Sequence, residues 1–269
     1  MSIRSSIPLS ELPPDLVWKA GSLAWTDVPG HPTGFSVLDD QLPGSGWPRG
    51  ALVELLSERP CAGEVMLLLP LMRSVPAHRW CAWIAPPHAV HAPALEAAGL
   101  PLSRLLLITP PDAAAALWAT RLALQSQACH VVLAWLPHID TAGLRRLQLA
   151  AEEAGTTLFL LRPTQTGCQP SPAVLRLHLQ PVGTALQIHI LKRRGPMHAA
   201  PLRIEWPQGW LHCAERTLSA GTPVASAVSA IPAENALQTL MKTSAQQAPQ
   251  TQARSAGRSP DHRVTSTRF

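Results

Sequence analysis

The segment between residues 50 and 71 has the pattern of a phosphate-binding loop but lacks the residues that bind phosphate. Its apolar run, its Ser/Glu/Arg/Pro-containing break and its second apolar run predict strand, loop and helix. A working loop reads Gly-x-x-x-x-Gly-Lys-Ser/Thr, because backbone amides hold the phosphates, the lysine neutralises their charge and the hydroxyl holds magnesium. Here Ser57 replaces the first glycine and Pro60 removes an amide donor. Gly63 is followed by Glu64, where Gly-Lys is expected if one extra residue is allowed.

Glu64 reverses the charge that a triphosphate requires. At about 4 Å and an effective dielectric near 20, each carboxylate–phosphate pair costs roughly 4 kcal/mol. A helix dipole offsets typically less than about 2 kcal/mol. We therefore expect no nucleotide cofactor here, and no catalytic residue in this segment.

Other reactive residues form no set with catalytic or metal-binding spacing. His88 and His91 are three apart and could share a helical face, but no nearby carboxylate or thiolate completes a metal site, so we predict no metal. The sequence has no Gly-x-Ser-x-Gly elbow for a serine nucleophile. The five cysteines are widely spaced and suggest neither disulfides nor zinc, which fits a reducing cytoplasm.

Composition predicts one globular domain with tails. The chain has 269 residues, of which 46% are apolar and 14% charged, enough for one α/β core of about 200 residues. We expect an N-terminal extension at 1–30, a domain at 31–212 and a low-complexity, mostly disordered basic tail at 213–269. The net charge is +5, and residues 242–269 hold five cations against one carboxylate, or +4 of that total. The apolar runs fall short of the roughly 20 residues of a membrane helix, so we expect a soluble cytoplasmic protein.

Alternating apolar and amphipathic segments predict an α/β fold with a mostly parallel sheet flanked by helices. The predicted strands lie at 51–56, 80–85, 105–109, 131–136 and 157–161, and the helices near 65–75, 89–98, 112–127 and 141–154. Three further strand-like runs, at 174–179, 186–191 and 202–206, follow without helices between them and predict antiparallel strands toward the C-terminus. A short helix is expected at 233–242.

Several motifs together resemble the RecA family. They are Pro32-Thr-Gly-Phe-Ser-Val-Leu-Asp, Gly44-Ser-Gly-Trp-Pro-Arg-Gly, His130-Val-Val-Leu-Ala-Trp and Ile190-Leu-Lys-Arg-Arg-Gly. Within that family, Trp47-Pro-Arg-Gly-Ala-Leu-Val-Glu-Leu-Leu, Trp83-Ile-Ala-Pro-Pro-His and Leu133-Ala-Trp-Leu-Pro resemble the SulA-like ImuA proteins of bacterial mutagenesis cassettes. The resemblance covers about residues 33–206 and implies a RecA-like core.

The resemblance also implies a function without turnover. The family's catalytic glutamate position is Pro87, and Ala134-Trp135 stands where its magnesium aspartate belongs. The implied role is a non-catalytic adaptor in SOS-induced translesion DNA synthesis. Its implied partners are an ImuB-type inactive Y-family polymerase homologue, an error-prone C-family DNA polymerase and RecA, with DNA contacted indirectly. The alternative is a SulA-like cell-division inhibitor that binds the tubulin-like division protein.

Candidate partner interfaces are basic or aromatic. The resemblance implies that Lys192, Arg193 and Arg194 could reach a neighbouring RecA protomer; the alternative is a solvated hairpin. Arg145 and Arg146 on one predicted helix suggest either a solvated face or a docking face. Among the tryptophans we expect Trp80, Trp83 and Trp118 in the core. We place Trp25, Trp47, Trp135, Trp206 and Trp210 at strand ends or loops, where tryptophan favours binding.

Overall fold

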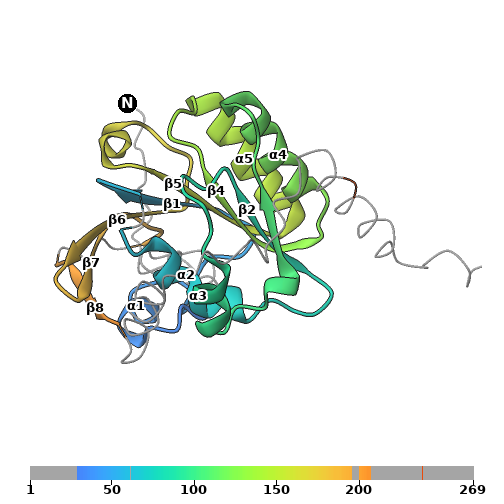
Figure 1. The fold of residues 1–269 in the computed structure, drawn as a ribbon. Coiled ribbons are helices and arrows are strands. Elements are labelled where there is room, and N and C mark those ends of the chain that lie inside the picture. The colour runs from blue at the N-terminus through green and yellow to red at the C-terminus, as the bar shows by residue number, and fades with distance from the viewer. Residues whose placement is uncertain (1–28, 61, 196–199, 207–237, 239–269) are drawn as a thin grey trace, which may run out of the picture.

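The computed structural model of the chain describes residues 29–60, 62–195, 200–206 and 238 (Figure 1). The predicted tail at 213–269 and the predicted helix at 233–242 lie outside these residues, apart from residue 238, as do all but the last two residues of the predicted extension at 1–30. The domain boundaries therefore remain predictions.

The described residues form one eight-stranded sheet with the order β3-β2-β4-β5-β1-β6-β7-β8. All pairs from β3 to β6 are parallel, and β6-β7 and β7-β8 are antiparallel. This arrangement confirms the predicted fold class. The three runs predicted toward the C-terminus pair antiparallel with one another as β6, β7 and β8, and β6 joins them to the rest of the sheet by pairing in parallel with β1. The strands are β1 (Leu52–Ser57), β2 (Trp80–Ile84), β3 (Leu105–Ile108), β4 (Cys129–Trp135), β5 (Thr157–Pro163), β6 (Leu175–Val182), β7 (Ala185–Lys192) and β8 (Leu202–Glu205).

Helices cover both faces of the sheet. Figure 1 shows α4 and α5 on one face and α1, α2 and α3 on the other. The helices are α1 (Ser36–Asp39), α2 (Glu64–Arg73), α3 (Ala92–Ala97), α4 (Ala113–Gln125) and α5 (Thr141–Ala154), with 3-10 turns η3 (Leu102–Arg104) and η4 (Thr164–Cys168). Asp112 and Asp140 cap α4 and α5, each accepting a hydrogen bond from the amide three residues later.

Strand β1 lies inside the sheet and divides the core. Val53 and Leu55 face the cluster beneath α2, whereas Leu52 belongs to the cluster beneath α4 and α5. This alternation gives β1 two buried faces, as its continuous apolar run predicted. Glu54, on the same face as Leu52, is nevertheless completely buried.

Two tryptophan predictions were wrong. Trp118, expected in the core, is 52% exposed, because α4 packs through its small residues, including Ala116, Ala119 and Ala123. Trp47, expected at a strand end or loop and not in the core, is completely buried. The chain before it folds back to form the His31–Trp47 bridge, and the Trp47 ring packs edge-on against Phe159 with centroids 5.1 Å apart.

Candidate functional site

A pocket of about 120 Å³ lies at the carboxyl ends of β1, β4 and β5, which we call the carboxyl-edge pocket. In parallel sheets this is where ligands usually bind. It brings together Ser57, Pro60 and Glu64 of the predicted loop, Pro87 at the predicted base position and Trp135 at the predicted metal position. Its remaining lining residues are Glu58, Pro137, Leu161, Arg162 and Pro163.

The junction of loop and helix is built around Gly63 and Glu64. Gly63 has φ of 103°, a left-handed conformation that suits glycine, and α2 begins at the next residue. A Cβ at Gly63 would lie 3.0 Å from the Trp206 ring, which therefore covers this helix end. Glu64 is only 2% exposed, and its carboxylate lies in the first turn, where the helix dipole favours a negative charge.

The residues present do not fit a nucleotide phosphate. Among the described residues, no lysine lines the pocket, whereas two carboxylates, Glu58 and Glu64, do. Arg162, the only cation among the described lining residues, donates from Nη1 to Glu54 Oε1 at 2.6 Å. Proline supplies four of these ten lining residues and no amide donor. An anionic triphosphate would therefore meet like charges and few donors.

Trp135 provides the pocket's aromatic wall. Its ring lies 5.7 Å from that of Trp83, centroid to centroid, and is partly buried. Its Nε1 is buried and makes no hydrogen bond within the described part of the chain. The position that would carry a metal-binding carboxylate thus holds an apolar ring.

Beside the pocket, three charged residues from adjacent strands form a buried ion network. Glu54 on β1 accepts from Arg162 on β5 at 2.6 Å and from Arg176 Nε on β6 at 2.5 Å. All three side chains are at most 8% exposed. Two arginines thus share one carboxylate inside the sheet.

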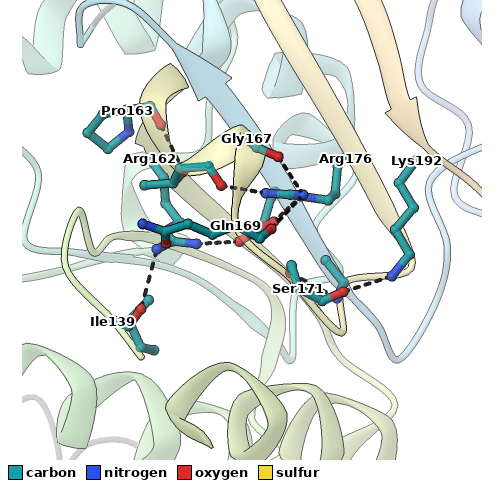
Figure 2. Close-up of polar contacts among 11 residues, drawn as sticks. Ile139, Arg162, Pro163, Gly167, Gln169, Ser171, Arg176 and Lys192 are labelled. Carbon is teal, nitrogen blue, oxygen red and sulfur yellow. Dashed lines mark hydrogen bonds and ion pairs between the residues drawn. The ribbon is translucent and has the colours of Figure 1, made fainter. Parts of the chain in front are cut away.

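The network holds the connection between β5 and β6 in place (Figure 2). This connection, residues 164–174, crosses β1 without an α-helix, using only the short turn η4. Arg176 donates to the carbonyl oxygens of Thr166, Gly167 and Gln169 at 2.9 to 3.1 Å. Arg162 also reaches the carbonyl of Ile139 at 3.4 Å. Hydrogen bonds to charged side chains here replace the packing that a crossover helix would supply.

Sequence analysis missed this network, although a signal was present. Glu54 lies between Val53 and Leu55, and Arg176 lies between Leu175 and Leu177. A charged residue inside an apolar strand is rarely buried alone. One acidic and one basic residue in such positions predict that their strands are neighbours.

The predicted basic segment lies at the opposite end of the sheet from the carboxyl-edge pocket, because it follows β7, which runs antiparallel to β6. Lys192 Nζ donates to the Ser171 carbonyl at 2.8 Å (Figure 2), and burial lowers the pKa of Lys192, with the charge of Arg176 acting in the same direction and Glu54 opposing it. Arg193 donates to the Gln41 carbonyl. Arg194 is exposed and makes no hydrogen bond or ion pair with the described residues. Two of the three cations thus have internal contacts.

Arg145 and Arg146 are exposed residues of α5. Neither makes a hydrogen bond or ion pair within the described ranges. Glu152 on the same helix accepts from Gln148 Nε2 at 2.7 Å, and Gln148 Oε1 accepts from the Leu52 amide. The structure therefore separates the predicted interface residues into three places: the carboxyl-edge pocket, α5 and the end of β7.

The described residues contain no group of three or more His, Cys, Asp or Glu that could hold a metal ion. No helix among them is both long and apolar enough to cross a membrane.

The chain is thus an α/β protein with a mostly parallel sheet, and the described residues at its carboxyl-edge pocket are not those that bind phosphate. Comparison with known proteins then identifies the family. Residues 51–158 match the family model "Cell division inhibitor SulA". "Cell division inhibitor SulA" of Edwardsiella piscicida is 34% identical over 45% of this chain and 71% of its own length. The protein of that name from Cronobacter sakazakii is 32% identical over 48% of this chain and 80% of its own length.

The chain therefore belongs to the SulA family. A solved structure, that of SulA from Pseudomonas aeruginosa, shares 31% identity over 41% of this chain and 97% of its own chain, with a TM-score of 0.36. The family model ends within β5, before Arg162, the 164–174 connection and β6 to β8.

Proposed function

We propose that this SulA-family chain is a non-catalytic adaptor in SOS-induced translesion DNA synthesis. In this role it links an ImuB-type inactive Y-family polymerase homologue and an error-prone C-family polymerase to RecA at damaged DNA. The observation that carries the proposal is the carboxyl-edge pocket. It has the strand, loop and helix of a phosphate site, but carboxylates, prolines and Trp135 line it.

The parts beyond the family model favour an adaptor over a division inhibitor. Strands β6 to β8 extend the sheet past β1, and the Glu54–Arg162–Arg176 network joins this extension to the matched region. Burying three charges is costly unless they are well paired, so the extension is built into the core. This supports the RecA-like core that the ImuA resemblance implies.

Cell-division inhibition is the second candidate function. The specific observation in its favour is the name of the relatives, each called a cell division inhibitor, together with the match over 51–158. Under this alternative the tubulin-like division protein is the partner, and the extension would be an addition to the inhibitor.

Deletion and expression in the source bacterium distinguish the two functions. If the chain is an adaptor, deletion lowers DNA-damage-induced mutation, and expression leaves cell length unchanged. If it is a division inhibitor, expression produces filaments and deletion leaves induced mutation intact. The adaptor role would be rejected if expression produced filaments and the deletion strain kept normal induced mutation.

Point variants test the candidate interface residues within this proposal. Lys192→Glu with Arg194→Glu tests RecA association, Arg145→Glu with Arg146→Glu tests the α5 face, and Trp135→Ala tests the pocket. Loss of co-purification with one partner, with others retained, would assign that place to that partner. Unchanged co-purification with every partner in all three variants would exclude these residues as interfaces.

A further inference from the structure

A second concave region lies at the amino end of the sheet, where β1 and β6 begin. Two pockets, of about 220 Å³ and about 40 Å³, share Pro43, Pro48, Val174 and Arg194, and so form one continuous surface. We call this surface the amino-edge groove. Its other lining residues are Gly30, Leu42, Gly46, Arg49, Gly50, Ala51, Gln148, Glu152, Leu175 and Arg193.

The charge of the groove is mainly positive. Arg49 and Arg194 line the larger pocket, and Arg193 and Arg194 line the smaller one. Glu152 is the one carboxylate among the described lining residues, and it already accepts a hydrogen bond from Gln148. Arg49 and Arg194 are both exposed, so their guanidinium groups are accessible to a ligand. This charge is opposite to that of the carboxyl-edge pocket.

The smaller pocket is predominantly apolar. Leu42 and Leu175 are buried in its floor, and Pro43, Pro48 and Val174 form its sides. Arginines therefore stand beside a recess that suits an aliphatic side chain. A ligand that complements both parts carries a carboxylate close to an aliphatic group.

Internal hydrogen bonds fix the walls of the groove. Arg49 Nε donates to the Pro29 carbonyl at 2.9 Å, and Arg193 donates to the Gln41 carbonyl. The Val174 amide donates to the Leu52 carbonyl at 3.1 Å, which ties the 164–174 connection to β1. A site whose walls are already ordered loses little conformational entropy on binding.

We propose that the amino-edge groove binds an acidic peptide segment of a partner protein. Asp or Glu of the segment pairs with Arg49 and Arg194, and an adjacent Leu, Ile or Val enters the apolar recess. A planar guanidinium group can form two parallel hydrogen bonds to one carboxylate. Such a contact fixes the orientation of the carboxylate and also neutralises its charge. This inference depends only on the residues of the groove, so it applies whether the chain is a translesion synthesis adaptor or a cell-division inhibitor.

Peptide chemistry fits the groove better than a nucleic acid does. Binding to a phosphate backbone relies on many cations along a path. Here the three arginines among the described lining residues flank an apolar recess, which a phosphate backbone would leave unfilled. The carboxylate-and-aliphatic combination uses both features of the groove.

Fluorescence anisotropy with defined peptide pools tests the proposal. One labelled octapeptide pool carries two Asp or Glu residues beside Leu, Ile or Val, and the matched pool carries Asn or Gln instead. We expect the full chain to bind the acidic pool at least about tenfold more tightly. Arg49→Glu with Arg194→Glu should abolish this binding and create binding to a pool with Lys or Arg in place of Asp or Glu.

Arg59→Glu with Arg203→Glu is the matched control, because it reverses the same number of exposed arginines outside the groove. It should leave acidic-pool binding unchanged. Equal binding by wild type and the Arg49/Arg194 variant, no acidic-pool binding at all, or equal loss in the control would overturn the proposal. Circular dichroism melts verify that each variant is folded.

Two other occupants are outcomes of the same test. Residues 10–16, Ser-Glu-Leu-Pro-Pro-Asp-Leu, have the same chemistry in sequence. The full-length chain with Glu11→Gln and Asp15→Asn tests whether this segment occupies the groove. If that variant binds the acidic pool and the wild type does not, the groove belongs to the chain's own segment, and docking of a partner is overturned. The peptide proposal would also be overturned if the chain bound a single-stranded oligonucleotide and not the acidic pool, and if reversing the charges of Arg49 and Arg194 removed that oligonucleotide binding.

Discussion

Glu54 on β1 and Arg176 on β6 occupy the same register position on adjacent parallel strands, with Arg176 Nε 2.5 Å from Glu54 Oε2. Arg162 approaches the other oxygen of the same carboxylate from β5. The two ion pairs therefore join β5, β1 and β6, and they link the SulA-matched region to the extension formed by β6 to β8. They also fix the connection that leads to the amino-edge groove.

Removing Glu54 should strongly destabilise the protein. Glu54→Leu leaves two arginines buried without their carboxylate, and breaking a buried pair typically costs about 3 to 5 kcal/mol. Urea denaturation measures this as a lower free energy of unfolding. The exposed pair Arg203–Glu205, at 2.6 Å, is the control, and Arg203→Ala should cost less than about 1 kcal/mol.

Replacing all three charged residues separates the free-energy cost of burying them from the stabilisation that their ion pairs supply. Glu54→Leu, Arg162→Met and Arg176→Met together should recover much of the stability that Glu54→Leu loses, because apolar residues of similar volume often replace buried ion networks at little cost. A Glu54→Leu protein as stable as wild type would show that the network contributes no pairing energy.

The two tryptophans that sequence analysis placed wrongly should differ sharply in stability effect. Trp47→Ala removes a completely buried ring packed on Phe159 and should cost about 3 to 5 kcal/mol. Trp118→Ala changes a side chain that is 52% exposed and should alter the free energy of unfolding by about 0.5 kcal/mol or less. Similar losses in both variants, measured by denaturant unfolding, would contradict the burial of these residues in the structure.

The regular elements could be predicted because their signals are local. Helix α5 has the predicted bounds, and each described strand overlaps its predicted run, since hydrophobic periodicity and the Asp140 cap lie within the segment itself. The positions predicted to meet at a phosphate site, among them Ser57, Pro87 and Trp135, do meet in one pocket. That follows from parallel strands ending at one edge.

What sequence could not supply depends on contacts between distant segments. The parallel direction of β6 is set by the 164–174 connection, which carries no helical pattern and is held by Arg176. The burial of Trp47 depends on residues 30–31 folding back onto it, and the cover of Gly63 comes from Trp206. The amino-edge groove combines residues from five parts of the chain and has no sequence signature.

The protein should lose stability below neutral pH through His31. Burial lowers the pKa of His31 from 6.5 to about 4, and the charges of Arg49, His130 and Arg79 act in the same direction. Below pH 6.5 the unfolded chain binds a proton that the folded chain does not, so stability is full above that pH and falls toward pH 4. The loss amounts to roughly 3 kcal/mol at most.

Unfolding measured from pH 7.5 to pH 4.5 tests this expectation. His31→Gln removes the titrating group and should flatten the pH dependence, even if it lowers the stability at pH 7.5. His130 contributes in the same direction, because burial also lowers its pKa. An identical slope in wild type and His31→Gln would show that other groups control the acid sensitivity.

The carboxyl-edge pocket should not accept a nucleoside triphosphate. A ligand at about 100 times its dissociation constant stabilises a folded protein by about 2.7 kcal/mol, which raises the melting temperature measurably. Because Glu58 and Glu64 line the pocket, and Arg162, the only arginine in the described part of its lining, is paired with Glu54, we expect no rise at millimolar Mg-ATP. Glu64→Gln removes one like charge but restores neither the lysine nor the amide missing at Pro60, so it should also show none. A magnesium-dependent rise in wild type that grows in Glu64→Gln would instead demonstrate that the pocket still binds triphosphate and that Glu64 merely weakens it.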